Sequence, residues 1–197
     1  MEQDAIASTQ TPVDIQPVSQ QAPCISQILS QNELNGEWGL GRISHYHRYS
    51  ATTNIGWPTY LYDEYIGKCP AGGTAYVLDS GVTTGHPEFT TGRATFGFKS
   101  NSVWPSHDVC GHGTHVAGII GGNKYGVMKK AKLISVKVLE GSGGACSGPW
   151  SGIIAGINWA FNDAVANGRL KTSVMNLSLG WFSHIYIPPM KELWLIL

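Results

Sequence analysis

The distribution of apolar residues predicts three short buried strands, each followed by glycine or polar residues. "TAYVLDSGV" (74–82) is a continuous apolar run that reaches Asp79 and then a turn. "KLISVKVL" (132–139) is rich in β-branched residues and stops at the glycine-rich "EGSGGACSGP", and "SVMNLSLG" (173–180) again ends in glycine. Short apolar runs bounded by turn residues are typical of strands that are buried on both faces.

Between the second and third runs, "SGIIAGINWAFNDAVANG" (151–168) has helical periodicity. Ser151 is expected to cap its start, and Gly168 fits the left-handed residue that follows many helices. One apolar face is expected to contact the core. Its members are Ile153, Ile157, Ala160, Phe161 and Ala164.

Strands that alternate with helices predict an α/β fold, with a mostly parallel sheet between two layers of helices. Ligands in such sheets bind beyond the carboxyl ends of the strands. Asp79 and the stretch Ser178, Leu179, Gly180 both fall at predicted strand ends, so both are expected at the functional edge. A chain of 197 residues is long enough for one such core.

Composition excludes several classes of partner. Thirteen Lys and Arg balance 13 Asp and Glu, so no net field attracts nucleic acid or an anionic membrane. No apolar stretch reaches the ~18 residues of a membrane-spanning helix. Residues 1–36 are rich in Gln, Ser, Thr and Pro, lack the pattern of a secretory signal and are expected to form a mobile leader. The four cysteines permit disulfides in three pairings.

The segment "DVCGHGTHVAGIIGG" (108–122) concentrates chemically active side chains, and three interpretations compete. The histidines are ordinary residues of a glycine-rich turn, or His107, Cys110, His112 and His115 bind zinc, although their spacing matches no usual zinc pattern. In the third interpretation one imidazole is a general base. Such a base needs a carboxylate that fixes its tautomer, and Asp79 is the natural partner.

The order "YVLDSGV", "GHGTHVAGIIGG" and "MNLSLG" closely resembles the subtilisin-like serine peptidases, in particular the proteinase K branch. The segments "WGLGRISH", "YGVMKKAKLISVKVL" and "IIAGINWA" extend the resemblance over about residues 36–180. It implies the subtilisin-like three-layer fold and peptide-bond hydrolysis by an Asp–His–Ser triad.

The resemblance assigns Asp79 as the triad acid and His112 as the base, with Asp79 within hydrogen-bond reach of the imidazole. It gives His115 a structural role, with its side chain directed to the interior or to backbone partners. Ser178, Leu179 and Gly180 match the strand that pairs with the substrate backbone, and the loop 143–150 falls where the second such strand lies. The thiol of Cys110 is expected to be either reactive beside the base or buried and inert.

The resemblance further implies polypeptide substrates, secretion and a monomer, with no nucleic acid or membrane partner. No cofactor is expected. Calcium is common in complete members of the family, but no ligands for it are assigned in this chain.

The chain departs from the family pattern in one decisive place. The nucleophile lies in a motif like "GTSMAxPHVAG" and the oxyanion-binding asparagine in an "AAGN"-like strand, and neither occurs in the 197 residues. After Gly180 the sequence is "WFSHIYIPPMKELWLIL", while "EQDAI" near the start resembles the last strand of an inhibitory propeptide.

The expected organisation is therefore a leader or propeptide remnant (1–36), the N-terminal part of a catalytic domain (37–180) and an unrelated tail (181–197). Without the serine, the chain is expected to be inactive and only marginally stable, with the leader and the tail least ordered. A peptide-binding pseudoenzyme fragment is the alternative, and a zinc-binding structural domain is a third hypothesis.

Overall fold

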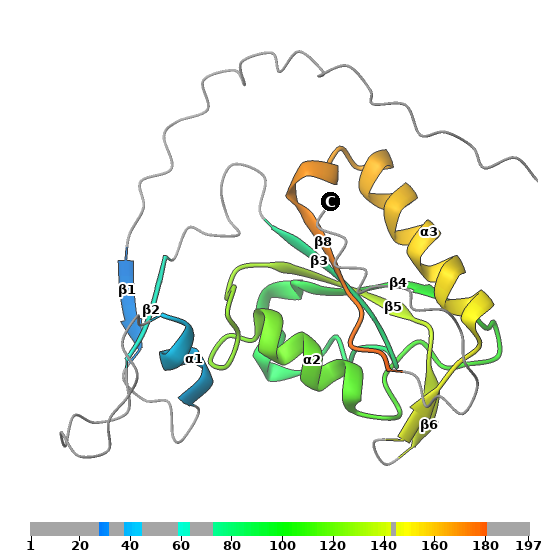
Figure 1. Ribbon diagram of the computed structural model, residues 1–197, viewed down its shortest axis with the longest axis horizontal. Coiled ribbons are helices and arrows are strands. Elements are labelled where there is room, and N and C mark those ends of the chain that lie inside the picture. The colour runs from blue at the N-terminus through cyan, green and yellow to red at the C-terminus, as the bar shows by residue number, and fades with distance from the viewer. Residues whose placement is uncertain (1–27, 32–37, 45–58, 64–72, 143–144, 181–197) are drawn as a thin grey trace, which may run out of the picture.

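The computed structural model describes residues 28–31, 38–44, 59–63, 73–142 and 145–180, and a four-stranded sheet lies at its centre (Figure 1). Its strands are β3 (Thr74–Asp79), β4 (Ala94–Lys99), β5 (Lys132–Lys137) and β8 (Ser173–Asn176). They pair in the order β4–β5–β3–β8, and each pair is parallel. The three predicted strands are confirmed, although the last one, predicted to reach Gly180, already ends at Asn176.

Two helices cover opposite faces of this sheet. The helix α2 (His112–Gly121) lies on one face and α3 (Trp150–Ala166) on the other (Figure 1). Alternate residues of β3 enter two separate apolar clusters. Ala75 and Val77 pack on the α2 side, whereas Tyr76 and Leu78 pack on the α3 side. The predicted three-layer α/β/α architecture is therefore confirmed, and alternation places Asp79 on the α2 face.

The helix α3 differs from its prediction at two positions. Its N-cap is Pro149, so Ser151 lies inside the first turn instead of capping it. Phe161, expected on the core face, is 42% exposed, because the buried stripe is made by smaller residues. Those residues are Gly152, Ile153, Gly156, Ala160 and Ala164. The expected left-handed glycine is present, since φ of Gly168 is 64°.

A small unit lies beside this core. The strands β1 (Ile28–Gln31) and β2 (Tyr60–Asp63) form an antiparallel pair next to α1 (Trp38–Ile43). The Tyr60 hydroxyl donates to the carbonyl oxygen of Val127 at 2.7 Å, which joins the unit to the loop that precedes β5.

The strand β1 falls within the predicted leader and was not predicted. The rest of the leader and the predicted tail (181–197) lie outside the described residues.

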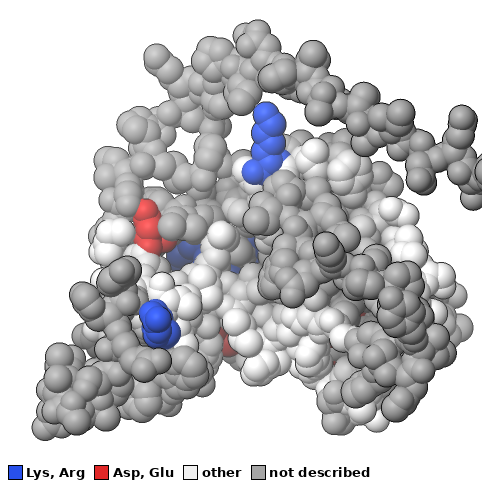
Figure 2. Space-filling model, in the orientation of Figure 1, with Lys and Arg blue, Asp and Glu red and all other residues white. Residues whose placement is uncertain are grey.

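The remaining described elements are short. They are the 3₁₀ helices η2 (Pro87–Gly92) and η3 (Leu170–Thr172) and the antiparallel pair β6 (Glu140–Ser142) and β7 (Ala145–Ser147). Among the described residues no helix has the length and apolar character needed to cross a membrane. Charged side chains are few and scattered on the face shown in Figure 2, in keeping with the sparsely charged sequence.

Candidate active site

Asp79 and His112 form a hydrogen-bonded pair at the carboxyl edge of the sheet. Asp79 is the last residue of β3 and is fully buried, whereas His112 is the first residue of α2 and its side chain is 43% exposed. Nδ1 of His112 lies 2.8 Å from Oδ1 and 3.0 Å from Oδ2 of Asp79. An ionised carboxylate can only accept hydrogen bonds, so Nδ1 donates and Nε2 is left as the acceptor. The predicted contact is confirmed, and the catalytic roles stay a prediction.

Two glycines allow α2 to lie this close to β3. A Cβ atom on Gly113 would overlap the carbonyl oxygen of Gly81 and would lie 3.1 Å from Cβ of Asp79. Gly81 itself has φ 107°, a backbone conformation that side chains rarely adopt. Small residues are therefore needed next to His112, because Asp79 and His112 come into contact only when the backbone of α2 lies against the turn that follows β3.

The carboxylate of Asp108 holds the first turn of α2 in place and connects it to Ser80, the residue that follows β3. Its Oδ1 accepts from the Ser80 hydroxyl at 2.8 Å, and Ser80 Oγ in turn accepts from the Gly113 amide at 3.0 Å. Burial raises the pKa of Asp108, but its hydrogen bonds outweigh burial, so the pKa lies below its usual value. Its further donors are the amides of Cys110, Gly111 and Thr114 and the Thr114 hydroxyl.

Sequence analysis gave Asp108 no role. The only signal was an acidic residue shortly before a helix start, which is a common cap position.

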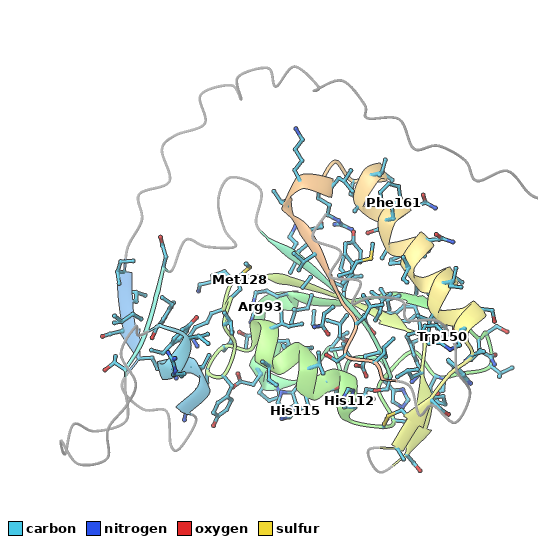
Figure 3. The ribbon with its side chains drawn as sticks, viewed as in Figure 1. Arg93, His112, His115, Met128, Trp150 and Phe161 are labelled. Carbon is cyan, nitrogen blue, oxygen red and sulfur yellow. A yellow bond between two sulfur atoms is a disulfide. The ribbon has the colours of Figure 1, made fainter. Side chains whose placement is uncertain are left out.

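His112 opens onto a cleft of about 690 Å³, and the residues predicted to bind substrate lie in that cleft. Ser178, Leu179 and Gly180 form one wall. The segment 146–150, which runs from β7 into α3, also lines the cleft, together with Leu139 and Ile153. Figure 3 shows His112 at the end of α2 that is nearer to Trp150. The cleft therefore combines one basic nitrogen with two exposed chain segments.

Comparison with known proteins identifies this arrangement. The sequence profile of the Subtilase family, peptidase S8, matches residues 74–186, which include Asp79, His112 and the segment 178–180. The chain belongs to the subtilase family of serine peptidases.

Individual subtilases show the same similarity. Subtilisin-like protease 5 of Arthroderma otae is 48% identical over 157 residues, which are 79% of this chain and 35% of that protein. Alkaline protease 1 of Aspergillus clavatus is 49% identical over 144 residues, 73% of this chain and 32% of the relative. The crystal structure of a cold adapted subtilisin-like serine proteinase superposes with a TM-score of 0.51 at 38% identity, covering 74% of this chain and 47% of the other. The chain spans about a third of the length of the curated relatives it matches.

Cys110, two residues before His112, is not a thiol. It forms a disulfide with Cys146 of β7, with 6.2 Å between the two Cα atoms. The expectation of a free Cys110 thiol, whether reactive or inert, is therefore wrong. The disulfide instead joins the segment just before α2 to β7, whose Cys146 lines the cleft. Cys24 and Cys69 lie outside the described residues.

The zinc hypothesis is also wrong. The sulfur of Cys110 is bonded to another cysteine, so it is not available as a thiolate ligand and the proposed set of four ligands is incomplete. Within the part of the chain that the structure describes, no group of three or more His, Cys, Asp or Glu side chains is placed to hold a metal ion.

His115 does not point into the protein, contrary to the prediction. It is exposed on α2, one turn beyond His112, and lines a separate groove with His86 and Tyr125 (Figure 3). The buried face of α2 is made by Gly113, Val116, Ala117 and Gly121, and this face excludes position 115.

Proposed function

We propose that Asp79 and His112 are the acid and the base of a subtilisin-like serine endopeptidase, and that its nucleophilic serine is not among these 197 residues. The observation that supports the proposal is the hydrogen bond between a fully buried carboxylate and an imidazole that is open to a cleft. The family membership supplies the reaction class, hydrolysis of peptide bonds through an acyl-enzyme.

In this proposal each member of the pair has its own role. Nε2 of His112 accepts the proton of the serine hydroxyl as that oxygen attacks the substrate carbonyl, and it later gives the proton to the leaving amine. Asp79 holds the ring in the Nδ1–H tautomer and stabilises the imidazolium that forms in between. Its complete burial strengthens that interaction, because little water screens the two groups.

The cleft walls fit an extended polypeptide substrate. Residues 178–180 continue from β8 without a ladder partner among the described strands, and Cys146 and Ser147 of β7 also line the cleft. Backbone groups on both sides can pair with a peptide laid between them, as in other proteins that add a strand to an exposed edge. We extend the proposal to polypeptide substrates and to a secreted enzyme, as the sequence resemblance implies.

No described serine completes the triad. Ser147 and Ser178 line the cleft, but the Ser178 hydroxyl donates to Oδ1 of Asn176 at 3.0 Å. Among the described residues, no serine hydroxyl is hydrogen-bonded to His112. The whole sequence also lacks a "GTSMA"-like motif. The 197-residue chain alone is therefore expected to bind peptides without hydrolysing them.

The test compares the chain with its His112→Ala variant in a casein or peptide-nitroanilide assay. Both are expected at background, because the oxyanion donors and the nucleophile, worth several kcal/mol, are missing. Hydrolysis that His112→Ala abolishes would show that a serine inside these 197 residues is the nucleophile. A second candidate function, peptide binding without turnover, is favoured by the same cleft. It is supported if a peptide binds and stays intact even when the chain is extended by the remainder of a subtilase.

A further inference from the structure

Lys137, the last residue of β5, is fully buried at the carboxyl edge of the sheet. Lysine is rarely buried unless it is paired, because its charged form loses hydration. The ammonium has three partners. It donates to the carbonyl oxygen of Ser80 at 2.5 Å and to that of His107 at 3.3 Å, and it lies 3.3 Å from Oε2 of Glu140.

These three partners belong to three different parts of the site. Ser80 follows the acid, His107 lies in the loop that leads into the base helix, and Glu140 begins β6, the strand that pairs with cleft strand β7. In the ladder between β3 and β5, Lys137 is the register partner of Asp79, so both side chains project from the same face of the sheet.

Ser80 connects the ammonium of Lys137 to both Asp79 and the start of the helix that carries His112. Its amide donates to Oδ1 of Asp79 at 2.7 Å, and its hydroxyl oxygen accepts from the amide of Gly113, the residue after the base. A shift of the Ser80 backbone therefore changes the orientation of the carboxylate and of the helix start together.

We infer that Lys137 is a positioning residue, whose ammonium holds the acid turn, the loop before the base and the cleft strand β6 in one arrangement. The inference relies on the proposed function only in taking Asp79 and His112 as the reactive pair. It assigns a task to a buried charge that the proton transfers themselves do not use.

The test measures the tautomer of His112 in the 197-residue chain by ¹⁵N NMR of labelled histidine, with His112→Ala for assignment. The measurement is made above the titration of the imidazole. The pair with Asp79 favours the Nδ1–H tautomer, so loss of alignment lowers the ratio of Nδ1–H to Nε2–H. In Lys137→Met we expect this ratio to fall about tenfold, the effect of losing roughly one buried hydrogen bond.

Lys129→Met is the matched control. Lys129 is also buried, and its ammonium donates to two backbone carbonyls, of Lys124 and Gly126, in the loop before β5. We expect a comparable loss of stability in this variant and an unchanged tautomer ratio. An equal fall of the ratio in both variants would mean that any buried lysine gives the effect, and would overturn the inference.

Glu140→Gln decides the matter if Lys137→Met does not fold. It keeps the shape of the side chain and removes the charge that Lys137 faces, and we expect the ratio to fall two- to threefold, less than for the loss of a whole hydrogen bond. A folded Lys137→Met chain, or Glu140→Gln, with an unchanged ratio would overturn the inference. The readout needs no turnover, so its result does not depend on whether a completed enzyme hydrolyses peptides.

Discussion

Tyr76 and Asp79, two of the buried polar residues of strand β3, lie three residues apart and have surroundings that are opposite in character. Tyr76 projects toward α3, where its hydroxyl donates to Asp163 at 2.7 Å and accepts from Nε of Arg169 at 2.9 Å. Asp163 and Arg169 also form an ion pair with each other. Burial, followed by the bond to Asp163, raises the pKa of Tyr76 to about 12. Every strong polar group of this cluster has a partner inside the protein.

Asp79 projects toward α2 and ends in an open network. Its partner His112 uses one ring nitrogen for the carboxylate and presents the other to the cleft. A closed network stabilises the fold and has no capacity left for a ligand. An open one keeps an unused acceptor beside a binding surface, and that difference separates a structural cluster from a candidate active site.

The largest expected effect concerns the acid. We consider a chimera in which residues 1–180 are followed by the C-terminal part of Alkaline protease 1 of Aspergillus clavatus, which supplies the remainder of a subtilase. Asp79→Asn in this chimera should lower kcat/KM about 10⁴-fold, because the amide favours the wrong tautomer of His112. Tyr76→Phe should leave kcat/KM within about twofold, since the closed network does not reach the cleft. A large loss of activity in Tyr76→Phe would erase the distinction between the two networks.

The next effect is on stability and tests the close approach of α2 to β3. Gly113→Ala places a methyl group on the carbonyl oxygen of Gly81 and should lower the free energy of unfolding by about 3 kcal/mol or more. Gly118→Ala is the control in the same helix, because its Cβ would meet no atom within 4 Å, and it should raise stability by up to about 1 kcal/mol. Urea unfolding measures both, and equal effects would contradict the packing described for Gly113.

Asp108 should give a pH-dependent effect of intermediate size. Its folded-state pKa lies below the usual value, so its stabilisation is complete above about pH 5 and is lost as pH falls through the folded pKa. Asp108→Asn should therefore cost about 2 kcal/mol at pH 7, and this cost should shrink as pH falls through the folded-state pKa. Urea unfolding of both chains at several pH values provides the comparison. A cost that is the same at all pH values would show that the charge of Asp108 is not what stabilises the turn.

The smallest effect should come from the closed network itself. Tyr76→Phe removes one hydroxyl but leaves the ion pair between Asp163 and Arg169, so the free energy of unfolding should fall by only about 1 kcal/mol. The tautomer ratio of His112 should not change. A change in that ratio would mean that the two faces of β3 are coupled.

The sequence was sufficient to predict that Asp79 and His112 meet, because both are marked by local pattern. Asp79 ends an apolar run, and His112 begins a helix rich in small residues. The sequence also contained the pattern that places Phe161 and His115 on exposed faces, although both were predicted to point inward. Glycines and alanines define the buried faces of α3 and α2, and these small residues carry little weight in an apolar pattern.

Other features depend on contacts between distant segments and leave no local trace. The disulfide of Cys110 exists because β7 brings Cys146 to the start of α2. Asp108 reaches Ser80, and Lys137 reaches Ser80 and His107, only after distant segments have met at one edge of the sheet. Sequence spacing reveals which side chains are available, and only the fold determines which of them meet.

The most direct test of the central claim is labelling of the chimera with a fluorophosphonate, which reacts with an activated serine. We predict that the parent chimera is labelled on the serine supplied by its C-terminal part, and that His112→Ala abolishes labelling while the protein stays folded. The His115→Ala chimera should be labelled like the parent, because His115 lies outside the cleft. Labelling that persists in His112→Ala, or a folded parent chimera that is never labelled, would contradict the claim that this chain carries the acid and the base of a serine peptidase.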